Sequence, residues 1–222
     1  LVGSPGQLRL AVAKDVPAAA VQFSKKGGRA PAKDALPKHR WTHLAGVWTL
    51  DRVLFFVDGQ LAGETAKSIG SMSNEPEPFV IGRGFTGQMD EVRLSKGARY
   101  LTPFVPKRRA GADSNTLALY HFDEGVGEIV KDFSGKNLNG RLTGAKWVRP
   151  NGNFLTPLGP ATNPPSTNPI SPLPPLTGLT PGDCALEFDG KTGYVDIPLK
   201  YDGSGPFTIE ATAMRVLLSI KL

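Results

Sequence analysis

This 222-residue sequence contains very little cysteine and lacks long hydrophobic runs. Cys184 is the only cysteine, so no disulfide can form within the chain, and we expect it to be a small apolar filler. The uncharged stretch 150–182 is interrupted by prolines and polar residues, which excludes it as a membrane span. No signal peptide is visible, but the sequence begins at Leu1 rather than Met, so this end predicts no compartment.

Nucleic-acid-binding motifs are also missing, although the formal net charge is +6. Basic residues gather in two stretches, 25–40 and 107–109. Neither is accompanied by the aromatic pattern of RNA-recognition sheets, by zinc-finger spacing or by a helix-turn-helix pattern. We therefore expect these charges to be solvated loop charges, and we predict no nucleic-acid partner.

Glycine and proline, by contrast, are abundant, with 26 and 20 residues. Both disrupt helix interiors, which excludes a helical bundle. Ten of the prolines fall between Pro150 and Pro181. The segment 149–182 has no hydrophobic period and is therefore predicted to be an extended, Pro-rich linker. It separates a body, residues 1–148, from a tail, residues 183–222.

Short strands with alternating apolar and polar residues account for the rest of the chain. In Trp41–Trp48, one predicted face carries Trp41, His43, Ala45 and Val47. Asp58-Gly59 predicts a tight hairpin turn between 53–57 and 60–64, because both turn positions favour positive φ. Only 96–104 is expected to form a brief helical turn. The remaining predicted strands are 7–13, 79–82, 88–94, 117–122, 146–148, 185–190, 194–198 and 207–211.

Five segments together resemble a laminin G-like domain of the concanavalin A-like lectin/glucanase type, as found in repeats of large bacterial, especially planctomycete, surface or multidomain proteins. They are WTHLAGVW; FFVDGQLAGE; FVIGRG with GQMDEVRLSKGARY; LALYHFDEGVGEIVKDFSGKNLNG; and ALEFDGKTGYVDIP with FTIEA. The resemblance implies an all-β, two-sheet antiparallel jelly-roll sandwich. It also implies an extracellular or cell-surface location.

The order of these segments differs from the family's order, in which the segment like ALEFDGKTGYVDIP opens the domain. We therefore expect the chain to be a fragment, with 1–148 a sandwich lacking its first strands and 183–222 the opening strands of a repeat. A sandwich without those strands would expose sheet edges and apolar surface. A flexible linker of this length reaches about 30 Å. We predict that the tail completes the sandwich, in its own chain or by strand exchange with another chain through 183–211.

Catalytic carboxylates are the first kind of site to consider, because the resembled fold hosts glycoside hydrolases. Retaining hydrolysis needs two carboxyl groups about 5–5.5 Å apart. The sequence has no Glu-x-Asp-x-x-Glu strand, and Asp90 and Glu91 are adjacent, so a regular strand would turn them to opposite faces. His39 and His43 lie outside any predicted helix and form no zinc pair. We predict that the protein is not an enzyme.

A calcium site and a sugar-binding site are the alternatives to a catalytic site. Calcium favours several oxygen ligands on a flexible loop, and the candidates are Asp123, Glu124, Asp132, Asn137 and Asn139, with Asp90 and Asp189 from neighbouring strands. The same residues also build turns, which is the other interpretation. Sugar rings stack on exposed aromatic side chains, for which the candidates are Trp48, Tyr100, Tyr120 and Tyr194, unless they pack in the core.

The predicted function is a non-catalytic binding or adhesion module that recognises a glycan or a protein within a larger surface protein. Two alternatives remain open. The domain is a structural spacer repeat, or it is a glycoside hydrolase of the same fold.

Overall fold

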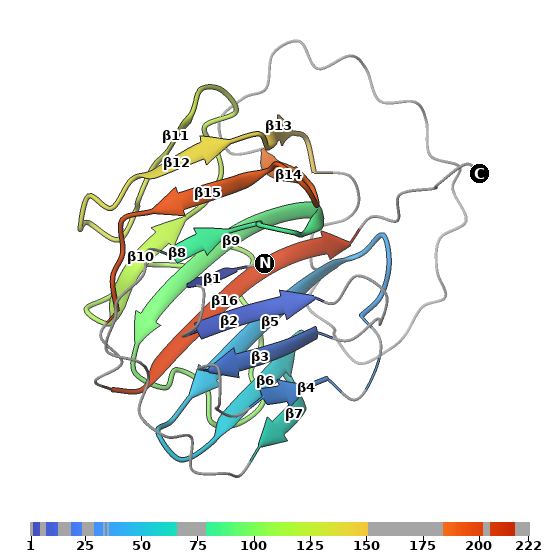
Figure 1. Ribbon diagram of the computed structural model, residues 1–222. Coiled ribbons are helices and arrows are strands. Elements are labelled where there is room, and N and C mark those ends of the chain that lie inside the picture. Colours follow the sequence, from blue (N-terminus) through green and yellow to red (C-terminus); the bar gives the residue numbers. More distant parts are fainter. Residues whose placement is uncertain are drawn as a thin grey trace.

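A computed structural model describes residues 2–4, 8–12, 19–23, 29–32, 34, 36–65, 79–150, 184–201 and 205–215. These residues form sixteen strands and no helix (Figure 1). The strands make two antiparallel sheets, which confirms the predicted all-β sandwich. Most of the predicted linker, much of the basic stretch 25–40 and the last residues of the tail lie outside the described residues.

The first sheet has eight strands, and each hydrogen-bonded pair is antiparallel. In spatial order they are β11 (Ile129–Val130), β12 (Gly140–Thr143), β15 (Tyr194–Ile197), β8 (Phe79–Ile81), β1 (Val2–Ser4), β2 (Leu8–Val12), β3 (Ala19–Phe23) and β4 (Arg29–Pro31).

The second sheet also has eight strands, seven of them in one row. In spatial order the row is β13 (Lys146–Val148), β14 (Ala185–Asp189), β9 (Thr86–Lys96), β16 (Phe207–Arg215), β5 (Trp41–Trp48), β6 (Val53–Val57) and β7 (Gln60–Thr65). The eighth strand, β10 (Thr116–Tyr120), also pairs with β9.

The main core lies between the sheets, and a smaller apolar cluster lies on the outer face of the second sheet. β5 contributes to both, because alternate residues point to opposite faces. Leu44 and Trp48 belong to the main core, whereas Ala45 and Val47 belong to the smaller cluster. The predicted division of this strand into two faces is confirmed.

The predicted hairpin turn at Asp58-Gly59 is also confirmed, and φ is positive at both residues, +48° and +75°. A Cβ atom on Gly59 would lie 1.9 Å from the carbonyl oxygen of Phe104. The turn therefore needs glycine both for its conformation and for the close approach of the segment that contains Phe104.

Strands from the C-terminal part of the chain occupy interior positions in both sheets (Figure 1). β16 lies between β9 and β5, β15 between β12 and β8, and β14 between β13 and β9. In the described residues, the tail strands thus share their sheets with the strands of the body. The boundaries predicted for body, linker and tail stay a prediction.

Two local expectations are wrong. Residues 97–104 form no helical turn, because the side chain of Arg99 is bound by Ser95 and Asp113 and the ring of Tyr100 stacks on Phe104. Asp90 and Glu91 also do not follow regular alternation. The register between β16 and β9 shifts at this point, and Glu91 has φ +52°, which indicates a β-bulge. Asp90 is the cross-strand partner of Thr212, and Glu91 and Thr212 line the same hollow on the outer face, so both carboxylates share that face.

Candidate functional site

Residues 97–115 cross the outer face of the second sheet, and we call this segment the strap. The backbone N–H of Phe104 donates to the carbonyl of Gly59 at 2.9 Å. Its ring stacks on Tyr100, with 3.5 Å between the centroids, and meets Phe56 and His43 edge-on. The apolar patch of β5 and β6 is thereby covered, which explains why an irregular segment is held against the sheet.

A buried network around Glu210 of β16 ties the strap to the sheet. The Arg93 guanidinium of β9 forms an ion pair with Glu210, and it also donates to the carbonyl of Gly111 at 2.8 Å. The hydroxyl of Tyr100 donates to Glu210 Oε2 at 2.8 Å, and Nε2 of His43 lies 3.2 Å from the same oxygen. Strap and sheet therefore share one charged cluster.

This arrangement determines the charge state of Glu210. Burial alone raises the pKa of the carboxyl, but the hydrogen bond and charge of His43 and those of Arg93 together outweigh burial and lower the pKa to about 2. Glu210 is thus a carboxylate at neutral pH. Burial and the neighbouring Glu210 raise the pKa of the Tyr100 hydroxyl, which stays protonated and donates.

A second cluster lies beside the first, around Glu91. His121 Nδ1 lies 2.9 Å from Glu91 Oε1, and both side chains are buried. The backbone N–H of Ala110 in the strap donates to Glu91 Oε2 at 2.8 Å. Arg109 approaches Glu91 at 3.6 Å and pairs with Asp123 at 2.7 Å. The outer face of the sheet therefore carries two buried histidine–carboxylate pairs, each bound to the strap.

Asp90, next to Glu91, has the opposite electrostatic environment. Its Oδ1 accepts the backbone N–H of Glu91 at 2.8 Å. Burial, with the adjacent charge of Glu91 as a smaller contribution, raises the pKa of Asp90 well above its ordinary value. The proton on Asp90 is consequently held more tightly than in water.

A cavity of about 420 Å³ lies between the strap and the sheet, and we call it the strap cavity. Its polar lining includes His43, Glu91, Arg93, Glu210 and Thr212. Two of these side chains have a buried polar atom without a hydrogen-bond partner among the described groups: Nδ1 of His43 and Oγ1 of Thr212. Such atoms cost free energy unless a polar group reaches them.

The charge state of Glu210 determines whether Nδ1 of His43 donates or accepts a hydrogen bond. Because Glu210 is ionised and can only accept, Nε2 of His43 must carry the proton that they share. Nδ1 is then an acceptor in neutral His43 and a donor in the imidazolium form. The hydroxyl of Thr212 can donate and accept. The partner that suits both atoms best is another hydroxyl, which also does both.

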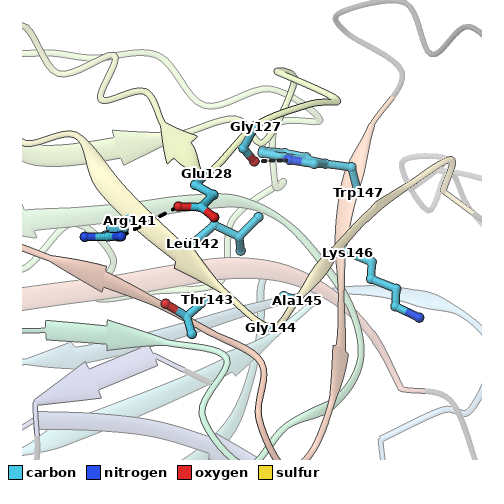
Figure 2. Close-up of a pocket in the computed structure, with 9 residues that line it drawn as sticks. All are labelled: Gly127, Glu128, Arg141, Leu142, Thr143, Gly144, Ala145, Lys146 and Trp147. Carbon is cyan, nitrogen blue, oxygen red and sulfur yellow. Dashed lines mark hydrogen bonds and ion pairs between the residues drawn. The ribbon is translucent and has the colours of Figure 1, made fainter.

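A second hollow, of about 630 Å³, lies at the hairpin between β12 and β13, and we call it the hairpin groove (Figure 2). The indole N–H of Trp147 donates to the carbonyl of Gly127 at 2.9 Å, which places the ring at one end of the groove. Arg141 and Glu128 form a long ion pair of 3.7 Å, and both are about three-quarters exposed. This groove is therefore open and charged at its rim.

The residues predicted to hold calcium do not form one cluster. The Asp132 carboxylate accepts the backbone N–H groups of Leu119, Ser134 and Leu138, and Asp189 accepts those of its own turn, 191–193. These hydrogen bonds lower the pKa of Asp189, and at Asp132 they outweigh burial, which raises the pKa.

The other predicted calcium ligands are divided between two places. Glu124 Oε1 accepts the backbone N–H of Lys131, and Asn139 accepts that of Asp132, so these two lie with Asp132 along one loop. Asn137 has φ +56° in the same loop, whereas Asp123 pairs with Arg109. Within the described ranges, no group of three or more His, Cys, Asp or Glu side chains is placed to hold a metal ion. The calcium site stays a prediction.

The aromatic residues predicted to contact sugars are also separated. Trp48 and Tyr120 pack in the core, 2% and 0% exposed, so neither ring can stack on a surface ligand, which corrects that expectation. Tyr194 lies under the guanidinium of Arg83, 4.7 Å from the ring centroid. Only Tyr100 lines the strap cavity.

Sequence reasoning did not identify Arg93, Glu210 and Thr212 as site residues, and it placed His43 only on one face of a predicted strand. The available signal was strand alternation: a strand that buries Ile209 must turn Glu210 and Thr212 to the outer face, as β5 does with His43. Trp147 was likewise seen only as a strand residue.

Comparison with known proteins identifies a family similarity for one part of the chain. Residues 2–102 match the family model described as the concanavalin A-like lectin/glucanases superfamily. No curated protein and no solved structure matches the chain significantly. Among the described residues, no helix is long and apolar enough to cross a membrane. The match supports a binding or related module in general. Residues 2–102 of the chain are thus similar to a laminin G-like domain of the concanavalin A-like lectin/glucanase superfamily.

Proposed function

We propose that the domain is a non-catalytic glycan-binding module that takes a sugar residue into the strap cavity. The observation that carries this proposal is the pair of buried atoms without a partner, His43 Nδ1 and Thr212 Oγ1. Neither atom is exposed to solvent, so sugar hydroxyls would pair with both after a small movement of the strap. A volume of about 420 Å³ lies within the range of ~300–1,000 Å³ typical of small-molecule sites.

The state of Glu210 supports binding rather than hydrolysis. A general acid must carry a proton at the working pH, whereas the pKa of Glu210 is lowered to about 2. Both of its oxygens already accept hydrogen bonds from Arg93, His43 and Tyr100. Glu210 therefore fits a role in holding the strap and orienting His43.

A glycoside hydrolase is the second candidate, and one observation favours it. The bulge brings Asp90, whose pKa is raised, to the same face as Glu91, and hydrolases pair a protonated with an ionised carboxyl group. Against this stands the position of Asp90, which is 6% exposed and does not line the strap cavity. Release of reducing sugar from a β-glucan panel, lost in Asp90→Asn, would establish hydrolysis.

A glycan array followed by titration calorimetry with the strongest hit tests the proposal. Thr212→Val keeps the shape of the side chain and removes one hydroxyl. We expect it to weaken binding about fivefold, from the loss of one hydrogen bond of about 1 kcal/mol, without lowering the melting temperature. Arg141→Ala in the hairpin groove is the matched control and should bind normally. Unchanged binding in Thr212→Val with loss in Arg141→Ala would move the site to the hairpin groove.

An array without hits would instead favour a structural spacer or a protein ligand. We also propose an extracellular or cell-surface location, which the family similarity supports and cell fractionation would test. Calcium binding is tested separately, by titration calorimetry with calcium chloride. If the titration releases no heat and calcium leaves the melting temperature unchanged, the calcium prediction is refuted.

A further inference from the structure

We propose that residues 184–215 form a separable donor segment, and that a second copy of this chain can supply this segment to the body formed by the other strands. The body would then act as a strand acceptor. This inference concerns how chains associate and does not depend on the ligand of the strap cavity.

The first support is the position of the donor strands in the sheets. β16 pairs with β5 from Phe207 opposite Trp48 to Met214 opposite Trp41, and it pairs with β9 on its other side. β15 likewise separates β12 from β8. Without the donor segment, each sheet would be divided in its interior and would leave unpaired backbone groups on the facing strands, which are templates for an incoming strand.

The second support is the apolar surface that the donor segment buries. Six large inward-facing side chains of its strands are at most 1% exposed: Leu186, Phe188, Val195, Ile197, Phe207 and Ile209. Removing them would open the main core between the sheets. The acceptor therefore offers both hydrogen bonds and an apolar slot, and a segment of the same sequence satisfies both.

The third support is the single connection between donor and body. Val148 in β13 and Ala185 in β14 are cross-strand partners, so the chain returns beside the point where it left. Thirty-six residues, 149–184, join these two positions. Because the donor strands are joined to the body at one point only, exchange requires no threading of the chain.

Concentration decides between the closed chain and the exchanged pair, because both contain the same contacts. For a linker of this number of residues, the effective concentration of the tethered segment beside its own body is on the order of millimolar. Dilute protein is therefore expected to be closed. Exchange becomes competitive where copies are concentrated or tethered together.

Complementation between two full-length variants tests the proposal. The donor-defective variant carries Phe207→Asp and Ile209→Asp, and the acceptor-defective variant carries Leu44→Asp and Leu94→Asp on β5 and β9. Each buries charges in the core and should lack cooperative unfolding alone. The exposed substitution Lys200→Asp is the control and should fold alone.

We expect the two defective variants, refolded together at high concentration, to regain up to half of the wild-type unfolding amplitude, since each pair of chains can build one intact domain. The regained material should elute as a dimer. A mixture that stays as unfolded as its components would overturn the proposal. Wild-type peptide 184–215, added to the donor-defective variant, gives an independent measurement, and its failure to restore folding would overturn the proposal as well.

Discussion

Replacing Glu210 by Gln should destabilise the domain and remove part of its sensitivity to acid. Glu210 is 3% exposed and contacts Arg93, His43 and Tyr100. The substitution keeps the size of the side chain but leaves the largely buried guanidinium of Arg93, 11% exposed, without its counter-ion. Removing one partner of a buried ion pair typically costs about 3–5 kcal/mol.

The pKa of Glu210 gives a second, independent magnitude. It is about 2 in the folded protein against an ordinary value of 4.5, which corresponds to about 3 kcal/mol of stability. Because the folded-state pKa is the lower one, this contribution is fully present above about pH 4.5. It is lost as the pH falls through about 2. Both arguments give a similar cost for Glu210→Gln at neutral pH.

Urea unfolding of the wild type and of Glu210→Gln, measured from pH 7 to pH 2, tests this reasoning. Other carboxylates with lowered pKa values, such as Asp132 and Asp189, titrate in both proteins and cancel in the difference. We expect a difference of about 3 kcal/mol at pH 7 that shrinks below pH 4.5. A difference below about 1 kcal/mol, or one that is constant with pH, would refute the network as described.

Two further predictions concern the neighbouring strands and turns. Asp90→Asn should stabilise the domain at pH 7. The folded-state pKa of Asp90 is raised, so its stabilising contribution is present below about pH 3.8 and is lost as the pH rises. The gain in melting temperature should shrink toward pH 4, and a lower melting temperature at pH 7 would contradict it. Gly84→Ala should lower the free energy of unfolding by about 1 kcal/mol, because Gly84 has a positive φ. Gly59→Ala should cost several times more, because Gly59 has a positive φ and also contacts Phe104. Equal costs in urea unfolding would show that the strap does not depend on this contact.

The strands and the first hairpin could be predicted because their signals are local. Trp41–Trp48 alternates apolar and small side chains, and the two faces it predicts are those observed. Asp58-Gly59 specifies a turn through φ preferences that act within two residues. The sandwich follows from many such strands and from the segments that resemble the family.

The candidate site could not be predicted because it depends on distant pairings and on a departure from regular strand geometry. His43 and Glu210 are 167 residues apart in sequence, and Arg93 and Glu210 are 117 apart. The bulge at Glu91 overturns the alternation that set Asp90 and Glu91 on opposite faces. Trp48 was a candidate for stacking on sugars, but it packs in the core. Residue type alone does not reveal which face of a strand is covered.

The measurement that tests the central claim most directly is the ¹⁵N NMR signal of the His43 imidazole during titration with the strongest array glycan. We expect the Nδ1 signal to shift with ligand, because a sugar hydroxyl pairs with an atom that lacks a partner among the described groups. His121, whose Nδ1 is already bound to Glu91, serves as the internal reference. A titration that saturates binding while the His43 signals stay fixed would contradict a ligand site in the strap cavity.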